Sequence, residues 1–497
     1  MTKMVQLTAA LNNAKKLKAG FGALLLVASA MRLPGQATSD DLAECQQTAQ
    51  RAEEHGDFGT AVQEYEQLAK WLPHSPEVQS NLGVALYFHD DYGKAAEAFR
   101  RSLALKENLY TPHLFLGLTL AKLSQPAAAA TELKKAVAIN GADPMAHMWL
   151  GYEYTDISQF EAAIAQFKIA AQEKPDDLDI WYALGQSYLG LGNEETARLV
   201  RLAPDSGRVW QLAGEQFETQ GNSGKALELY IGAFKRRPDL DDLRARIIAL
   251  GGKPPAEKHE VSATRAREDQ IYARIKKDET LTRNAFERVA LIDPDSSRAH
   301  QVLANSYAAA GRFDDAIREY QMVLQRAPEL PGIHVALCDA LSRIGQLQEA
   351  IKECEAEIAI APFNSEAYAD AARVLLLAHE DEQAENLLDK ALTLESPPAF
   401  VYKLLGKLYL DQKKYRQAHD MLSRYLSTET TDASAYYLQA RACRFSGAQQ
   451  CMDQAIAAFK RTSDAAKNTN GVQDVLGANR GQGKVSDDDE SGMREAP

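Results

Sequence analysis

The sequence lacks the short signatures that mark several classes of enzyme. Its 497 residues contain no H-E-x-x-H, no G-x-S-x-G and no C-x-x-C, which are patterns of zinc peptidases, serine hydrolases and dithiol redox enzymes. The segment "GANRGQGKVS" (477–486) is a poor phosphate-binding loop, because five residues instead of four precede Gly483 and because Val485 stands where Ser or Thr is needed. We therefore expect no catalytic residue, no cofactor and no enzymatic activity.

Long hydrophobic runs are also missing. One 13-residue apolar run, "AGFGALLLVASAM", follows three lysines and stops at Arg32. A helix that spans a bilayer needs about 20 apolar residues, so this run fits the core of a secretory signal better. We predict that residues 1–37 are a signal peptide and that the chain is exported, to the periplasm or the cell envelope. The alternatives are an uncleaved N-terminal anchor, which would bring the chain to the membrane, and a cytosolic amphipathic helix.

Basic residues are fewer than acidic ones, 56 against 69. The formal net charge is −13, and removal of residues 1–37 takes away five basic residues and no acidic ones, which moves it to −18. Phosphate backbones and anionic membrane surfaces repel a body this acidic. Nucleic acid is therefore not expected as a partner.

Glycines recur every 34 residues in the first half of the chain. They are Gly83, Gly117, Gly151 and Gly185. Around the last of them, "WYALGQSY" (181–188) fits the pattern W-x2-L-G-x2-Y. A fixed period over this distance indicates a repeat architecture. The residues that fill the period resemble the tetratricopeptide repeat, a helix-turn-helix unit of 34 residues, over nearly all of 40–463.

This resemblance implies an all-α, right-handed solenoid of about twelve copies. The copies begin near residues 42, 76, 110, 144, 178, 207, 263, 297, 331, 365, 399 and 433. Small residues at the Gly185 position would let paired helices approach closely, while large residues fill the space between helices. We predict two arrays, 40–250 with six copies of which the fifth is shortened, and 263–463 with six copies of which the first is degenerate.

Three segments depart from the period. We expect a break at Gly190–Asn193 between two helices of the fifth copy. The Gly and Pro pairs of 251–262 predict a linker. The charged segment 263–296 is either a degenerate copy or one long capping helix. The polar, glycine-rich segment 464–497 is predicted to be a disordered tail.

Histidine and cysteine occupy packing positions of the repeats. His113, His147, His300 and His334 take the place of Trp181 in their copies, which favours packing over metal binding, and no metal site is expected. The sequence also allows two disulfides, leaving Cys45 unpaired. The candidate pairs are Cys338 with Cys354 and Cys443 with Cys451. The alternative for each pair is two small buried hydrophobic side chains.

Function in such a solenoid is expected on the groove lined by the first helix of each copy. By resemblance, its exposed positions are the second, fifth, ninth, twelfth and thirteenth. In the first array these positions predict an apolar peptide-binding groove with Tyr87, Phe88, Leu114, Leu118, Met145, Met148, Tyr152 and Tyr182. In the second array they predict a basic groove with Asn305, Arg343, Arg373, Lys403, Lys407 and Arg441. The alternative is that the superhelix covers these residues or that the register is in error.

The sequence therefore predicts a non-catalytic scaffold of the cell envelope that binds protein or peptide segments. An apolar helix or extended peptide suits the first groove, and an acidic segment suits the second. The alternative function is a regulatory or assembly subunit of an envelope enzyme complex. The sequence leaves the oligomeric state open.

Overall fold

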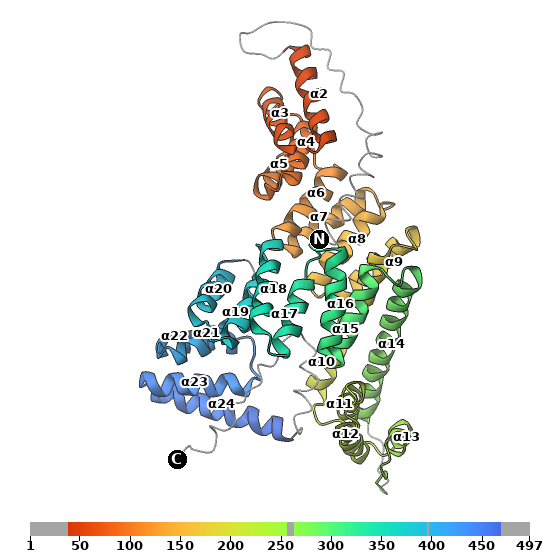
Figure 1. Ribbon diagram of the computed structural model, residues 1–497, viewed down its shortest axis with the longest axis vertical. Coiled ribbons are helices and arrows are strands. Elements are labelled where there is room, and N and C mark those ends of the chain that lie inside the picture. Colours follow the sequence, from red (N-terminus) through yellow and green to blue (C-terminus); the bar gives the residue numbers. More distant parts are fainter. Residues whose placement is uncertain (1–37, 256–262, 395–396, 469–497) are drawn as a thin grey trace. The chain divides into compact units, whose positions relative to one another are not determined.

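The computed structural model describes residues 38–255, 263–394 and 397–468, and these contain 23 helices and no strand. Ten pairs of consecutive helices pack as hairpins, and three helices stand alone (Figure 1). The prediction of an all-α solenoid built from helical hairpins is confirmed. The chain divides into two compact units between Ser187 and Tyr188.

The first unit holds four hairpins. They are α2 (Ser39–His55) with α3 (Phe58–Trp71), α4 (Pro76–Phe88) with α5 (Tyr92–Leu105), α6 (Tyr110–Lys122) with α7 (Pro126–Ile139), and α8 (Pro144–Asp156) with α9 (Phe160–Glu173). Helix α10 (Leu178–Leu202) follows and contains the boundary between the units.

The second unit holds six hairpins and two single helices. Its elements are α11 (Gly207–Thr219) with α12 (Ser223–Arg236), the single helices α13 (Asp241–Ala249) and α14 (Ala263–Ile292), α15 (Ser297–Ala309) with α16 (Phe313–Arg326), α17 (Ile333–Arg343) with α18 (Leu347–Ile360), α19 (Ser365–Leu377) with α20 (Asp381–Thr393), α21 (Phe400–Asp411) with α22 (Tyr415–Leu426), and α23 (Ala433–Ser446) with α24 (Gln449–Asn468).

The turn inside most hairpins contains one residue in the left-handed conformation. In the first unit these residues include Asp90, Ser124 and Ser158, with φ of 61°, 58° and 58°, and in the second they include Gly221, Gly311, Gly345, His379, Lys413 and Gly447. Left-handed φ is accessible to glycine and is tolerated by short polar residues. From 90 to 158 and from 311 to 447 these residues lie 34 positions apart, which matches the period of the solenoid.

The two helices of a hairpin touch through a small residue on the first and a large one 16 positions later. A Cβ added to Gly151 would lie 2.7 Å from the Phe167 ring, and one added to Gly214 would lie 2.6 Å from Tyr230. These distances are shorter than any ordinary contact, so only glycine permits this approach. The small residue predicted from the 34-residue period is therefore the contact point of the hairpin.

The expected break in the fifth copy is wrong, because α10 runs as one helix through Gly190–Asn193. Gly192 lies against α14, where a Cβ added to this glycine would lie 3.6 Å from Asp278, and Glu195 forms a 3.3 Å ion pair with Arg274 on the same helix. Glycine inside a helix costs only about 1 kcal/mol relative to alanine, which packing can offset. The fifth copy is therefore a single helix and not a shortened hairpin.

The remaining boundaries differ modestly from expectation. Helix α14 is one helix of 30 residues, so the segment after the linker is a single long helix and not a helical hairpin. Helix α24 extends to Asn468, so the predicted tail from 464 begins inside it. Residues 1–37, 256–262 and 469–497, which include the predicted signal and most of the predicted linker and tail, lie outside the described residues. Among the helices that are described, none is long and apolar enough to cross a membrane.

Candidate functional site

The four histidines at the Trp181-equivalent position bond within their own hairpins. Each Nδ1 atom meets an oxygen on the second helix 19 residues later, in the pairs His113–Glu132, His147–Gln166, His300–Glu319 and His334–Glu353, at 2.6–2.7 Å. The hydrogen bond with Glu353 raises the pKa of His334 against the opposing effect of burial. These histidines hold hairpins together, as predicted, and do not gather around a common point.

The predicted apolar groove of the first unit is half covered. Four of its eight side chains, Tyr87, Leu114, Leu118 and Met148, are between 3% and 6% exposed. The Tyr87 ring packs within 5.4–5.7 Å of the rings of Phe88, Tyr92 and Phe115, and burial raises the pKa of its hydroxyl. The expectation that these four side chains are open to a ligand is therefore wrong, because the first helices pack against their neighbours through them.

The other four groove positions in the first unit remain partly accessible. They are Phe88, Met145, Tyr152 and Tyr182. Phe88 stacks on Phe58 at 5.0 Å, and the Tyr182 hydroxyl accepts a hydrogen bond from Gln186 at 2.8 Å. An apolar surface thus remains here, but it is smaller than the sequence indicated.

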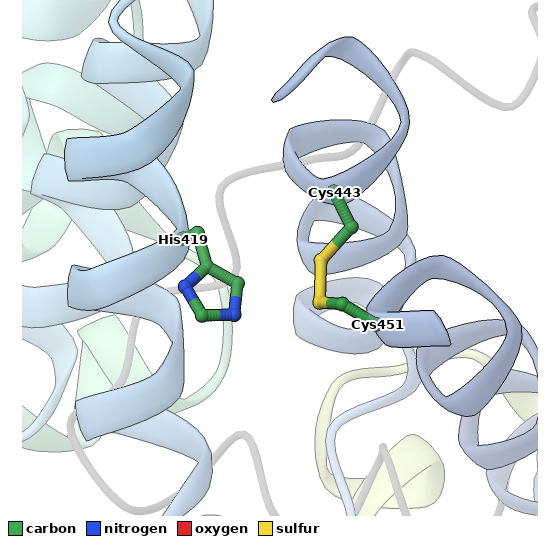
Figure 2. A group of neighbouring side chains, drawn as sticks. All are labelled: His419, Cys443 and Cys451. Carbon is green, nitrogen blue, oxygen red and sulfur yellow. A yellow bond between two sulfur atoms is a disulfide. The ribbon is translucent and has the colours of Figure 1, made fainter. Parts of the chain in front are cut away.

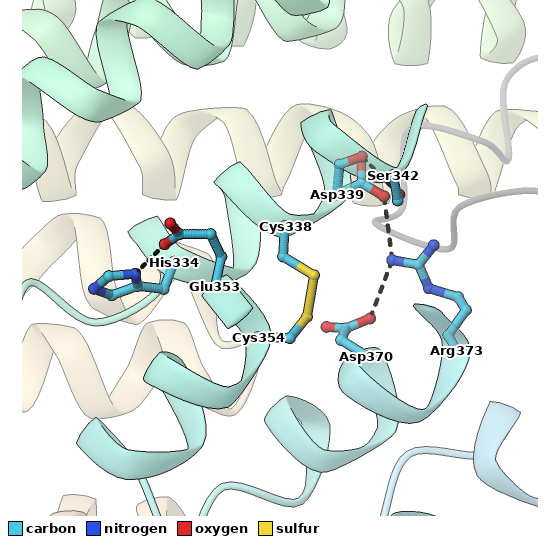
Figure 3. The surroundings of a disulfide bond; sticks show 8 residues. All are labelled: His334, Cys338, Asp339, Ser342, Glu353, Cys354, Asp370 and Arg373. Carbon is cyan, nitrogen blue, oxygen red and sulfur yellow. Dashed lines mark hydrogen bonds and ion pairs between the residues drawn. A yellow bond between two sulfur atoms is a disulfide. The ribbon is translucent and has the colours of Figure 1, made fainter. Parts of the chain in front are cut away.

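The predicted basic groove of the second unit is largely neutralised by acidic neighbours. Asp339 pairs with Arg343 at 3.1 Å. Arg373 pairs with Asp339 at 3.1 Å and with Asp370 at 3.5 Å (Figure 3). Lys403 lies 2.9 Å from Asp432 and donates to the Ser434 hydroxyl at 2.8 Å. The expectation of an open basic groove along this unit is therefore wrong for Arg343, Arg373 and Lys403.

The pKa values of these two buried acids shift in opposite directions. It raises the pKa of Asp370 to about 6, although Arg373 acts against that rise. At Asp432 burial also acts to raise the pKa, but Lys403 and the hydrogen bonds to the carboxylate outweigh it and hold the pKa below its ordinary value. Asn305, another predicted groove residue, accepts a 2.8 Å hydrogen bond from Tyr320.

Two predicted groove cations differ from the rest. Lys407 is exposed and Arg441 is partly exposed, and no ion pair to either is found within the described residues. They occupy the ninth position of consecutive copies, 34 residues apart. Asp339 and Arg373 also occupy the ninth position of consecutive copies, and their side chains are in contact. Lys407 and Arg441 therefore place two cations at equivalent positions on the first helices of the last two hairpins.

An open pocket of about 360 Å³ lies close by in sequence, where α22 begins and α23 ends. It is lined by Lys413, Lys414, Tyr415, Arg416, Gln417, Phe445 and Ser446. Phe445 is 54% exposed and stacks on Tyr415 with 5.0 Å between ring centres. Arg441 and Phe445 are four residues apart on α23 and so share one face of it. We call Lys407, Lys413, Tyr415, Arg416, Arg441 and Phe445 the basic-aromatic surface.

The position rule for the groove missed half of this surface. Lys413, Tyr415 and Arg416 lie in and after the turn between the helices of a hairpin, while the rule considers only the first helix. A usable signal was the sequence "KKYR" (413–416), in which an aromatic residue is surrounded by cations.

The cysteines form two bonded pairs in the structure. Cys338 on α17 is joined to Cys354 on α18, with Cα atoms 5.6 Å apart (Figure 3). These residues are 16 positions apart, so the disulfide replaces the glycine–aromatic contact of other hairpins. Cys443 is joined to Cys451 with Cα atoms 5.7 Å apart. Cys45 is a buried free thiol beside Glu64, and burial raises its pKa to about 12.

Comparison with known families identifies the repeats. A TPR repeat model matches residues 151–192, and tetratricopeptide repeat models match residues 307–356 and 47–109. The "Heat shock protein sti1 homolog" of Schizosaccharomyces pombe is 30% identical over 116 residues, which are 23% of this chain and 20% of that protein. "Tetratricopeptide repeat protein 13" of Homo sapiens is 28% identical over 133 residues, 26% of this chain and 15% of that protein. The chain thus spans a fifth or less of these curated relatives.

Among solved structures, a thermophilic TPR protein of Thermus thermophilus is 18% identical, with a TM-score of 0.32, and the match covers 54% of this chain and 100% of that one. The three family matches and the ten hairpins make this chain a tetratricopeptide repeat protein. Repeats of this family bind proteins or peptides and are generally not catalytic, which supports a role in protein interaction.

Proposed function

We propose that this scaffold binds an acidic protein segment at the basic-aromatic surface of its last two hairpins. The observation that carries the proposal is the combination of accessible cations with an exposed, stacked aromatic pair. Lys407 and Arg441 supply charge, and Phe445 on Tyr415 supplies an apolar platform that is already ordered. Exposed aromatic side chains next to cations are typical of surfaces that bind partners.

The electrostatic setting supports an anionic ligand. Charges that are already paired, such as those of Arg373 and Lys403, would have to lose a partner before they could bind a new one. Lys407 and Arg441 need no such exchange. Lys414, by contrast, contacts Glu385 at 3.1 Å and contributes less. Binding should therefore concentrate at the end of the second unit instead of extending along its whole length.

The test is a binding titration with two labelled peptides, one that alternates glutamate with phenylalanine and one in which glutamine replaces glutamate. We expect the acidic peptide to bind more tightly and to weaken as salt is added, because salt screens exposed charges. The double variant Lys407→Glu/Arg441→Glu should lose at least about tenfold in affinity, or about 1.4 kcal/mol. The variant Phe445→Ala should weaken both peptides.

A matched control reverses two charges elsewhere in the same unit. Lys352 and Lys390 are at the surface of the second helices α18 and α20, so Lys352→Glu/Lys390→Glu changes the net charge equally. This control should bind the acidic peptide almost as the wild type does. Equal losses in both double variants would reduce the effect to net charge and would overturn the proposed location.

We also propose that the scaffold works in the cell envelope, on the strength of the lysines and apolar run in residues 1–37. In the first unit, Phe88, Met145, Tyr152 and Tyr182 support a second contact with an apolar segment. Fractionation of cells that express the full-length chain, with determination of its mature N-terminus, tests the location. Retention of the chain with soluble cytosolic proteins and an intact Met1 would contradict it.

A further inference from the structure

One side-chain cluster in the second unit has no part in the proposed peptide binding. His419 on α22, Cys443 on α23 and Cys451 on α24 bring an imidazole nitrogen and two sulfur atoms within 4.8 Å of one another. Figure 2 shows the His419 ring facing the bond between the two sulfurs from the neighbouring hairpin. We propose that these three residues form a zinc site when the Cys443–Cys451 disulfide is reduced.

The ligand chemistry fits zinc. Two thiolates and one imidazole are ligands that Zn²⁺ prefers, at about 2.3 Å for sulfur and about 2.1 Å for nitrogen. In a tetrahedral site such ligands lie roughly 3.5–3.8 Å from one another. Once the sulfur–sulfur bond is broken, the three atoms need to shift by only about 1 Å to reach that arrangement. Three protein ligands leave the fourth position to water.

The surroundings of the cluster leave the imidazole available. Its Nδ1 atom lies 3.3 Å from an oxygen of Asp420 and its Nε2 atom lies 3.5 Å from the Ser423 hydroxyl, and both distances are long for hydrogen bonds. Ser423 already accepts from Gln439 at 3.0 Å. The other repeat histidines differ, because each holds a carboxylate or amide oxygen at 2.6–2.7 Å.

The disulfide and the zinc site cannot exist at the same time, because both use the sulfur atoms of Cys443 and Cys451. A dithiol reductant gives two electrons and two protons to the disulfide, which yields two thiols and the oxidised reductant. Zinc then binds the two thiolates and releases two protons. The disulfide links α23 to α24 inside one hairpin, whereas the metal would also link α22 of the preceding hairpin. The redox state would thus decide whether the last hairpin is tied to its neighbour.

The test is zinc binding by the full chain after reduction with a dithiol and its removal under anaerobic, metal-free conditions. A competition titration against a chromogenic chelator should give one bound Zn²⁺ per reduced chain and none per oxidised chain. His419→Ala and Cys443→Ser should each remove this binding. Absence of binding by the reduced wild type, or unchanged binding by His419→Ala, would overturn the proposal.

The other disulfide provides a matched control. Cys338 and Cys354 are also paired between two helices, but no histidine joins them in a cluster of possible ligands within the described chain. The variant Cys338→Ser/Cys354→Ser should therefore keep its single zinc. A measurement on the wild type guards against misfolded variants: zinc should protect Cys443 and Cys451 from alkylation and leave Cys338 and Cys354 as reactive as before. Equal protection of all four, or of none, would contradict the site.

Discussion

Arg373 reaches back across one repeat to Asp339, with 3.1 Å between a guanidinium nitrogen and a carboxylate oxygen. The two residues hold the same position in consecutive copies, so this contact joins the groove faces of two hairpins. It also neutralises the Arg373 guanidinium, which could otherwise bind the carboxylate of a peptide. Pairing of this kind explains why a groove that is basic in sequence offers few accessible cations in the structure.

Asp370 should make the stability of the second unit depend on pH. Its folded pKa, raised to about 6 by burial, exceeds the value of the unfolded chain, so protonation favours folding. The ionised carboxylate is a cost at pH 7 that begins to fall as the pH drops through 6 and is gone below the unfolded pKa of about 4. We expect Asp370→Asn to gain stability relative to the wild type as the pH rises from about 5 to about 7.5, by on the order of 1 kcal/mol. Urea unfolding at several pH values measures this, and a difference independent of pH would refute it.

The glycine–aromatic contact of the hairpins should be sensitive to one methyl group. Gly151→Ala places a Cβ 2.7 Å from the Phe167 ring, and relief of that overlap should cost about 1–3 kcal/mol. Gly93 is also helical but has no atom within 4 Å of its Cβ position, so Gly93→Ala should be neutral or stabilising by up to about 1 kcal/mol. Denaturant midpoints of the two variants measure the contrast, and similar midpoints would mean that the contact tolerates a larger residue.

Glu353 should control the titration of His334. The hydrogen bond between them raises the pKa of His334, with Glu357 adding to the effect, so the pair stabilises the fold fully below the ordinary histidine pKa. That contribution is lost as the pH rises through the folded pKa. Glu353→Gln copies the neutral His147–Gln166 pair and should lower the pKa of His334. NMR titration of the imidazole measures it, and an unchanged pKa would assign the shift to other groups.

Tyr87 should behave as a core residue and not as a ligand contact. It is 3% exposed and meets three other rings, so Tyr87→Ala should cost about 3–5 kcal/mol of stability. Leu105 is 40% exposed, and Leu105→Ala should cost less than about 1 kcal/mol. Thermal unfolding followed by circular dichroism compares them. If Tyr87→Ala were as stable as the wild type, Tyr87 would not be a core residue and could again be considered a ligand contact in the groove.

The sequence predicts the hairpins well because their period depends on local features. Glycine at 83 or 151 and a left-handed residue in each turn recur at fixed spacing, and these features need no knowledge of distant contacts. The continuous helix α10 could not be predicted in this way. There, contact with α14, about 80 residues later, offsets the cost of Gly190 and Gly192.

The candidate sites were harder to predict because position rules describe one repeat at a time. The ninth position alone does not reveal that Asp339 neutralises Arg373, since that contact joins two copies. The same limit hides the approach of His419 to Cys443 and Cys451, which come from the next hairpin. Charge and ligand sets that cross between repeats therefore require the structure.

The most direct test of the proposed function is hydrogen–deuterium exchange of the full chain with and without the acidic peptide of alternating glutamate and phenylalanine. The account predicts slower exchange on binding in α21, at the start of α22 and at the end of α23, around Lys407, Tyr415 and Phe445. It predicts no change for Lys407→Glu/Arg441→Glu at the same peptide concentration. Protection confined to α4, α6 and α8, or equal protection in that variant, would contradict the basic-aromatic surface as the binding site.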